Sequence, residues 1–157
     1  SHDKRPFKEW FGVFPAIKGG RKSDHGGYYI HLEPNRCMFG GGIWCPNNDL
    51  LYALRKEILS NYDELEAIFA TPQTNKYFQD FDSTYMLKKI PQGFPKDFVH
   101  ADWLKLKAFT FSTPLTDQQV ADPHFVDLVT EISRAAKPIN DFLNYTFEEY
   151  GEFPNRK

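Results

Sequence analysis

A hairpin-like pattern near the start of the chain constrains the fold most strongly. In Tyr28–Leu32 the apolar side chains alternate with the others, which is typical of a strand with one buried face. The next four residues, Glu33–Arg36, contain a proline that presets φ and an asparagine that tolerates a left-handed backbone. A second extended segment, Cys37–Trp44, follows directly. The sequence therefore predicts an antiparallel hairpin whose two strands are joined by a tight turn.

Three consecutive glycines interrupt the second strand of this hairpin, at positions 40–42. Glycine inside a strand indicates a bulge, or a close approach by another backbone or by a ligand. The glycines do not belong to a P-loop, because no Gly-Lys-Ser/Thr follows them.

Helical spacing of apolar residues begins after the hairpin. Pro46–Asn48 supplies a helix start, and leucines then recur at helical spacing as far as Ile58. Asn61, with Glu64 three residues later, has the pattern of a capping box. We therefore expect two helices here, the second beginning at Asn61.

The rest of the chain combines short strands with a helical last third. Thr84–Lys89 and Leu106–Thr113 are predicted to be strands, and Thr116–Gln119 has the pattern of a capping box. One helix is expected after Asp122–Pro123 and another from Pro138. Because strands come early and helices late, the order favours an α+β fold. We expect an antiparallel sheet of about four strands with helices packed on it, and a mainly helical C-terminal part.

Length and charge limit what the chain can be. Its 157 residues are 41% hydrophobic, which suits a single domain over 1–157 with one core. The formal net charge of −2 predicts no general attraction to nucleic acid, and no apolar run is long enough to span a membrane. Oligomeric state stays open.

The two cysteines, Cys37 and Cys45, are predicted to be unbridged. Eight residues of extended chain separate them by roughly 26 Å, at about 3.3 Å per residue. A disulfide needs Cα atoms within about 7 Å. Free thiols favour a cytoplasmic location.

The search for catalytic and metal-binding patterns finds no complete set. No Gly-x-Ser-x-Gly is present, and neither cysteine has an adjacent histidine. His100 and Asp102 form the only close His/carboxylate pair that looks ligand-like, whereas a zinc site needs three or four converging ligands. We interpret the pair as a loop histidine beside an N-capping aspartate. The sequence predicts no metal site and no cofactor, and whether the protein is an enzyme stays open.

A basic stretch near the N-terminus is the most distinctive charged feature. Lys4 and Lys8 flank Pro6, and lysines act as point charges toward phosphate or carboxylate groups. A solvated loop of ordinary surface lysines explains the same pattern, since charge runs usually lie on solvated faces.

The same stretch resembles a known family. Lys4, Pro6 and Lys8 match the second half of the signature R-x-x-R-D-x-R-F-x-x-x-K-x-P-Y-K-T of the bacterial and fungal family called domain of unknown function 2461. Phe7 stands where that signature has Tyr, and Glu9 where it has Thr. Further stretches similar to the family are 27–34, 41–46 with Leu54 and Arg55, 89–97, and 104–107. The resemblance implies that the family's three arginines and a helical segment would lie upstream of Ser1.

Two hypotheses follow for function. In the first, the chain binds an anionic small molecule carrying phosphate or carboxylate, because clustered Arg and Lys suit such groups. The candidate binding residues are Lys4, Lys8, His31, Trp44, Arg55 and Lys107. In the second, the chain is a non-enzymatic interaction or scaffold module, and its basic residues form structural salt bridges.

Overall fold

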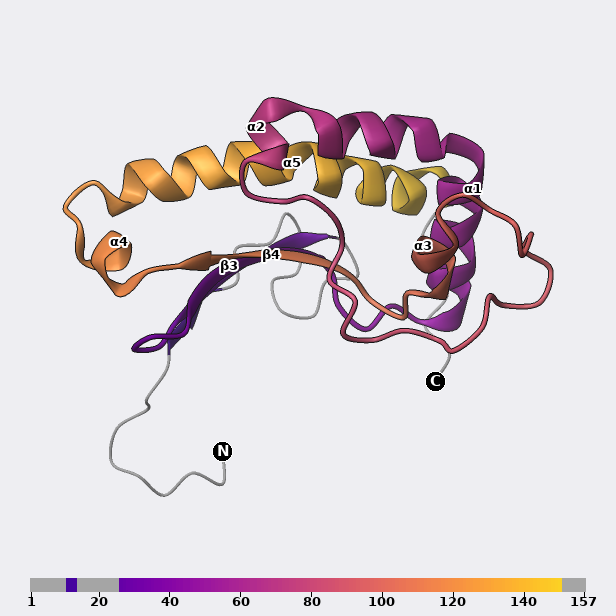
Figure 1. Cartoon of the computed structure of the whole chain (residues 1–157), viewed down its shortest axis with the longest axis horizontal. Helices are drawn as coiled ribbons and strands as arrows, with labels where there is room; N and C mark the ends of the chain where they lie inside the picture. Colours follow the sequence, from indigo (N-terminus) through magenta and orange to yellow (C-terminus); the bar gives the residue numbers. More distant parts are fainter. Residues whose placement is uncertain (1–10, 14–25, 151–157) are drawn as a thin grey trace, which may run out of the picture.

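The protein is an antiparallel sheet with helices on one face (Figure 1). The computed structural model describes residues 11–13 and 26–150. In this part of the chain the strands are β1 (Phe11–Val13), β2 (Gly27–Leu32), β3 (Cys37–Ile43) and β4 (Phe109–Leu115), paired antiparallel in that order. The helices are α1 (Asn48–Ala70), α2 (Pro72–Asn75), α3 (Ala101–Lys105), α4 (Asp117–Ala121) and α5 (Phe125–Tyr150). The predicted α+β class and the helical C-terminal part are confirmed. The sheet consists of three strands of six or seven residues and the three-residue β1.

One face of the sheet supplies the core. Phe39 of β3 and Phe109 and Phe111 of β4 are at most 1% exposed, and α1 and α5 pack over this face. Alternation along the strands sends Tyr29 and His31 to the opposite face, which we call the outer face. None of the described helices covers the outer face in Figure 1.

One of the two predicted helix starts corresponds to a break in the structure and the other is wrong. At Asn61 the backbone is non-helical, with φ of −130° and ψ of 32°, so α1 consists of two helical segments joined by a kink where the second helix was expected. The Asn61 amide donates to Glu57 Oε1 (2.8 Å). Pro138 lies inside α5 rather than at a helix start. The lost backbone hydrogen bond is tolerated because the flanking Ala135 and Ile139 are fully buried, so tertiary packing fixes the helix. The capping box of Thr116 and Gln119 is confirmed at the start of α4.

The predicted strand 84–89 is reduced to a short ladder. A single bridge joins Met86 to Leu106, flanked by hydrogen bonds from Leu87 N to the Lys105 oxygen (2.7 Å) and from Lys107 N to the Tyr85 oxygen (2.9 Å). Accordingly, β4 begins at Phe109, three residues later than predicted.

The glycines of β3 are required by close packing, as the sequence predicted. A Cβ on Gly41 would lie 2.5 Å from the Phe111 ring. Gly42 has φ of +100°, and a Cβ there would lie 2.0 Å from the Phe109 carbonyl oxygen. The approaching groups are therefore a ring and a backbone of β4.

Two buried asparagines on successive turns of α5 bind the end of the sheet. Asn140 accepts from Gly42 N and donates to the Gly27 oxygen, both at 3.1 Å. Asn144 accepts from Gly26 N (2.6 Å) and donates to the Gly26 oxygen (3.3 Å). The two asparagines thereby give hydrogen-bond partners to four backbone groups at the end of the sheet, and these bonds fix where β2 begins and β3 ends.

Asp82 binds the edge of β4. Its backbone N donates to the Thr110 oxygen (2.7 Å), and its carboxylate accepts from Ser112 Oγ (3.0 Å) and Thr110 Oγ1 (3.3 Å). Burial raises the pKa of Asp82, and the two hydroxyl hydrogen bonds oppose this shift without cancelling it.

The free energy of unfolding of Asp82→Asn, relative to that of the unsubstituted protein, should therefore increase as pH rises. A carboxyl whose pKa is higher in the folded state binds its proton more tightly there, so stability is lost as pH rises above the ordinary Asp value of about 4. The uncharged amide of Asn at this position does not titrate, so the variant does not lose this stability as pH rises. Urea unfolding at about pH 3 and pH 7 tests this, with Asp63→Asn on the exposed side of α1 as the charge-matched control. A stability difference that does not change with pH would contradict the assignment.

Candidate functional site

Three of the predicted binding residues converge on the short ladder of 85–87 with 105–107. Arg55, from α1, donates through Nη2 to the Leu106 carbonyl oxygen at 2.8 Å. Lys107 follows Leu106 directly, and its backbone N binds Tyr85. Trp44, just beyond β3, packs edge-on against the Tyr85 ring with centroids 5.3 Å apart. Residues distant in sequence thus meet at one end of the molecule.

The aromatic part of this cluster is open to solvent. Trp44 is 62% exposed and Tyr85 is 48% exposed, although both are large apolar side chains. Exposed rings beside cations are suited to contacting a ligand, because each ring offers a wide apolar surface. The sequence hypothesis that Trp44 lies in the core is not supported by this position.

Arg55 supplies a buried charge. It is 8% exposed, its Nε has no hydrogen-bond partner, and none of the carboxylates in the described part of the chain pairs with it. Burial lowers the pKa of Arg55, yet a guanidinium keeps its proton in proteins. A buried cation without a counterion is costly, so an anion placed beside Arg55 would offset that cost.

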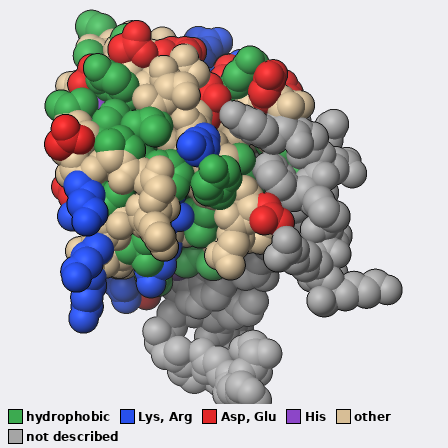
Figure 2. Space-filling model, turned by 90° about the vertical axis from the view of Figure 1, so that its right-hand side faces the viewer, with side chains coloured by type: hydrophobic (Ala, Val, Ile, Leu, Met, Phe, Trp, Pro, Cys, Tyr) green, Lys and Arg blue, Asp and Glu red, His purple; other side chains and the backbone are tan. Residues whose placement is uncertain are grey.

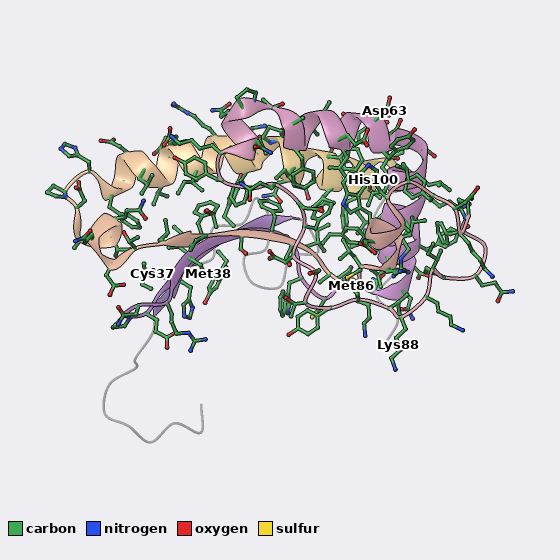
Figure 3. All side chains as sticks on the ribbon, in the orientation of Figure 1. Cys37, Met38, Asp63, Met86, Lys88 and His100 are labelled. Atoms are coloured by element: carbon green, nitrogen blue, oxygen red, sulfur yellow. The ribbon has the colours of Figure 1, made fainter. Side chains whose placement is uncertain are left out.

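Lysines lie on and next to the two segments of the ladder. Lys88 and Lys107 are exposed and form no ion pair with any described residue, whereas Lys105 lies 3.7 Å from Asp102. We call Trp44, Arg55, Tyr85, Lys88 and Lys107 the lysine–aromatic face. Figure 2 shows Lys and Arg side chains gathered along one edge of this end of the molecule, and Figure 3 places Lys88 and Met86 there.

Lys56 extends the positive charge toward the loop after residue 90. Its Nζ lies 5.6 Å from the Tyr52 ring and 5.5 Å from the Phe94 ring, within reach of cation–π attraction. The two rings themselves meet nearly at right angles, 5.8 Å apart. Cations therefore continue along α1 from Arg55.

The structure does not bring His31 to the lysine–aromatic face. His31, on β2, is paired with Met38 of β3. Six residues of extended chain, about 20 Å, separate Met38 from Trp44. Figure 3 shows Met38 and Met86 well apart along the molecule. Lys4 and Lys8 lie outside the described residues.

Sequence reasoning missed Tyr85 and Lys88. Both belong to the segment predicted as a strand, but nothing in that pattern tells which segment pairs with it. Only the register, with Met86 opposite Leu106, brings them to Arg55 and Lys107.

The described residues do not include three His, Cys, Asp or Glu side chains grouped to hold a metal ion. His100 stacks on Trp103 with centroids 3.8 Å apart, and its Nε2 lies 2.5 Å from Glu66 Oε1. His100 occupies the N-cap position of α3, and Asp102 lies in the first turn, so the predicted capping role of Asp102 is wrong. Cys37 and Cys45 are unbridged, as predicted.

Comparisons with known proteins give the family. None of the helices in the described part of the chain is long and apolar enough to cross a membrane. Neither a curated protein nor a solved structure matches the chain. One family model, described as "Conserved hypothetical protein (DUF2461)", matches residues 1–142, which include Lys4, Lys8 and every residue of the lysine–aromatic face. The chain belongs to the DUF2461 family of conserved hypothetical proteins.

Proposed function

We propose that the protein binds an anionic small molecule, bearing phosphate or carboxylate, at the lysine–aromatic face. The observation that carries this proposal is the buried Arg55 guanidinium, which has no carboxylate partner among the described residues. Lys107, which follows the Leu106 that Arg55 binds, and Lys88, which follows the paired segment, supply further charge on the same ladder, and Trp44 with Tyr85 supplies an apolar wall. An anion there would be bound by charge-assisted hydrogen bonds, which are the strongest hydrogen bonds that side chains make.

We also propose a cytoplasmic location, which the free thiols Cys37 and Cys45 favour. The alternative is a scaffold module, which would need the lysines of the face to be held in ion pairs. Lys88 and Lys107 form no ion pair within the described part of the chain, which favours ligand binding over that alternative.

A thermal-shift titration with inorganic phosphate, adenosine monophosphate and citrate tests binding. A probe at about a hundred times its Kd stabilises the folded state by about 2.7 kcal/mol, which raises Tm by about 5–10 °C. Lys107→Ala should reduce the affinity for the effective probe about tenfold. Arg134→Ala removes an equal charge from an exposed position on α5 and should leave it unchanged. Absence of a shift with all three probes, or equal losses in both variants, would contradict the proposal.

Arg55→Met separates binding from folding. Replacing a buried, unpaired charge with an apolar side chain of similar length should raise the probe-free stability by about 1 kcal/mol or more, while the shift with the effective probe disappears. Urea unfolding measures the first effect and the titration the second, with Arg134→Met as the exposed control. If Arg55→Met instead lowers stability and keeps the shift, Arg55 serves as a structural donor to Leu106.

A further inference from the structure

The ladder between 85–87 and 105–107 places a ring and a cation side by side on its outward side. Because Met86 is paired with Leu106, Tyr85 lies opposite Lys107. Met86 and Leu106 pack against the core, whereas Tyr85 and Lys107 are both exposed. Residues directly opposite each other on paired strands point to the same side, with Cβ atoms about 5 Å apart. Tyr85 and Lys107 are therefore neighbours on one accessible surface.

Arg55 lies on the other side of the same peptide unit. The peptide that joins Leu106 to Lys107 donates its N–H to the Tyr85 carbonyl oxygen, at 2.9 Å. Its own carbonyl oxygen accepts from Arg55 Nη2, at 2.8 Å. The N–H and C=O of a trans peptide point in opposite directions, so Tyr85 and Arg55 flank the backbone of Lys107. A ring and two cations thus meet at one peptide unit.

Trp44 enlarges the ring surface and has no structural role of the usual kind. Its ring meets that of Tyr85 at 88°, and such an edge-on contact covers the face of one ring only. The buried Trp103, by contrast, stacks on His100, and its indole N–H donates to Asp80 at 2.8 Å. The Trp44 indole N–H takes part in none of the hydrogen bonds among the described residues. Packing within the described part of the chain therefore leaves Trp44 available to a ligand.

The rings distinguish among the anions that the proposed function allows. Inorganic phosphate, a sugar phosphate or citrate would bind to the cations alone and would leave the Trp44 and Tyr85 rings in water. A nucleoside phosphate uses both, because its planar base stacks on aromatic side chains while its phosphate binds Lys or Arg. Its sugar holds base and phosphate apart by a few ångströms, which suits a ring and a cation on strands about 5 Å apart.

We propose that the anion bound at the lysine–aromatic face is a nucleoside phosphate. Its base stacks on Trp44 and Tyr85, and its phosphate binds Lys107, with the Arg55 guanidinium adding positive charge beside it. This assignment rests on the proposed function and adds to it the part of the ligand that the rings bind. Stacking tolerates any base, because every base has a π-face, so one nucleotide suffices as the probe.

Adenosine monophosphate and ribose 5-phosphate test this assignment as a matched pair, because they share the sugar and the phosphate and only the first has a base. Thermal-shift titration of the protein with each probe gives its affinity. Stacking of a base on an aromatic side chain typically contributes about fivefold or more in affinity. Adenosine monophosphate should therefore bind at least about fivefold more tightly than ribose 5-phosphate. Adenosine, which lacks the phosphate, should bind more weakly than adenosine monophosphate.

The nucleoside assignment and the proposed function fail in different ways. Ribose 5-phosphate binding as tightly as adenosine monophosphate would overturn the nucleoside assignment and leave the anion site standing. Adenosine binding as tightly as adenosine monophosphate would overturn the assignment too, since the phosphate would then contribute nothing. Absence of a shift with inorganic phosphate, citrate, ribose 5-phosphate and adenosine monophosphate would overturn the proposed function itself, and the assignment with it.

Trp44→Leu and Trp44→Phe separate stacking from general packing. Trp44→Leu keeps an apolar side chain but removes the ring, so the preference for adenosine monophosphate over ribose 5-phosphate should fall about fivefold. Trp44→Phe keeps a ring at the same position and should retain most of the preference. Lys107→Gln should weaken the binding of both probes equally and leave the preference unchanged, because both carry the same phosphate.

Both probes are measured on the same variant, so a change in its stability does not imitate a selective loss of one of them. An unchanged preference in Trp44→Leu, or equal losses in Trp44→Leu and Trp44→Phe, would overturn the assignment. A loss confined to adenosine monophosphate in Lys107→Gln would also overturn it, because Lys107 would then bind the base rather than the phosphate.

Discussion

Gly42→Ala should lower Tm by about 10 °C, corresponding to a loss of about 3 kcal/mol or more in the free energy of unfolding. Two effects add at this position. The backbone φ of +100° is strained for any residue with a Cβ, at a cost of about 1–2 kcal/mol. The new Cβ would also lie 2.0 Å from the Phe109 carbonyl oxygen, which belongs to the paired strand and cannot move without breaking the β3–β4 ladder.

Gly93→Ala isolates the first effect. Gly93 has φ of +89°, but a Cβ there would have no atom within 4 Å, so this variant should lose only the conformational contribution. Thermal and urea unfolding of both variants measure the difference, which we assign to the contact with Phe109. Equal losses in the two variants would show that β4 moves away at little cost.

The sequence predicted those parts of the fold that depend on local patterns. The alternation in 28–32, the turn at 33–36 and the capping box at Thr116 are each fixed by neighbours in the chain, and the structure confirms them. The helix start expected at Asn61 corresponds to the kink in α1. Pro138 was misjudged because its local signal favours a helix start, whereas burial of Ala135 and Ile139 keeps α5 continuous. Tertiary packing outweighed a local preference at Pro138.

The candidate site was predictable only in part, for a related reason. Residue type alone suggested Trp44, Arg55 and Lys107, and the ladder between 85–87 and 105–107 brings them together. Neither this pairing nor the burial of Arg55 can be derived from periodicity, because the pairing joins Met86 to Leu106 and Arg55 binds Leu106 from 51 residues away. His31 alternates with the apolar side chains of its strand, but without a partner strand its side of the sheet was undetermined.

Asn140→Ala should destabilise the protein by about 2–4 kcal/mol. The side chain is 2% exposed and bridges Gly42 N and the Gly27 oxygen, and its removal would leave both part-buried backbone groups without that partner. Each such orphaned group costs about 1–3 kcal/mol. Gly42 lies two residues before Trp44, so loosening this end of β3 should also weaken probe binding at the lysine–aromatic face.

Urea unfolding of Asn140→Ala, Asn144→Ala and the double variant measures how the two asparagines share this role. They bind adjacent backbone, at Gly26–Gly27, so the double variant should lose less than the sum of the single losses. Thr130→Ala removes an exposed side-chain bond to the Val126 carbonyl on the same helix and should cost under about 0.5 kcal/mol. A loss in Asn140→Ala as small as that control would mean that solvent satisfies Gly27 and Gly42, and that β3 is held by its strand partners alone.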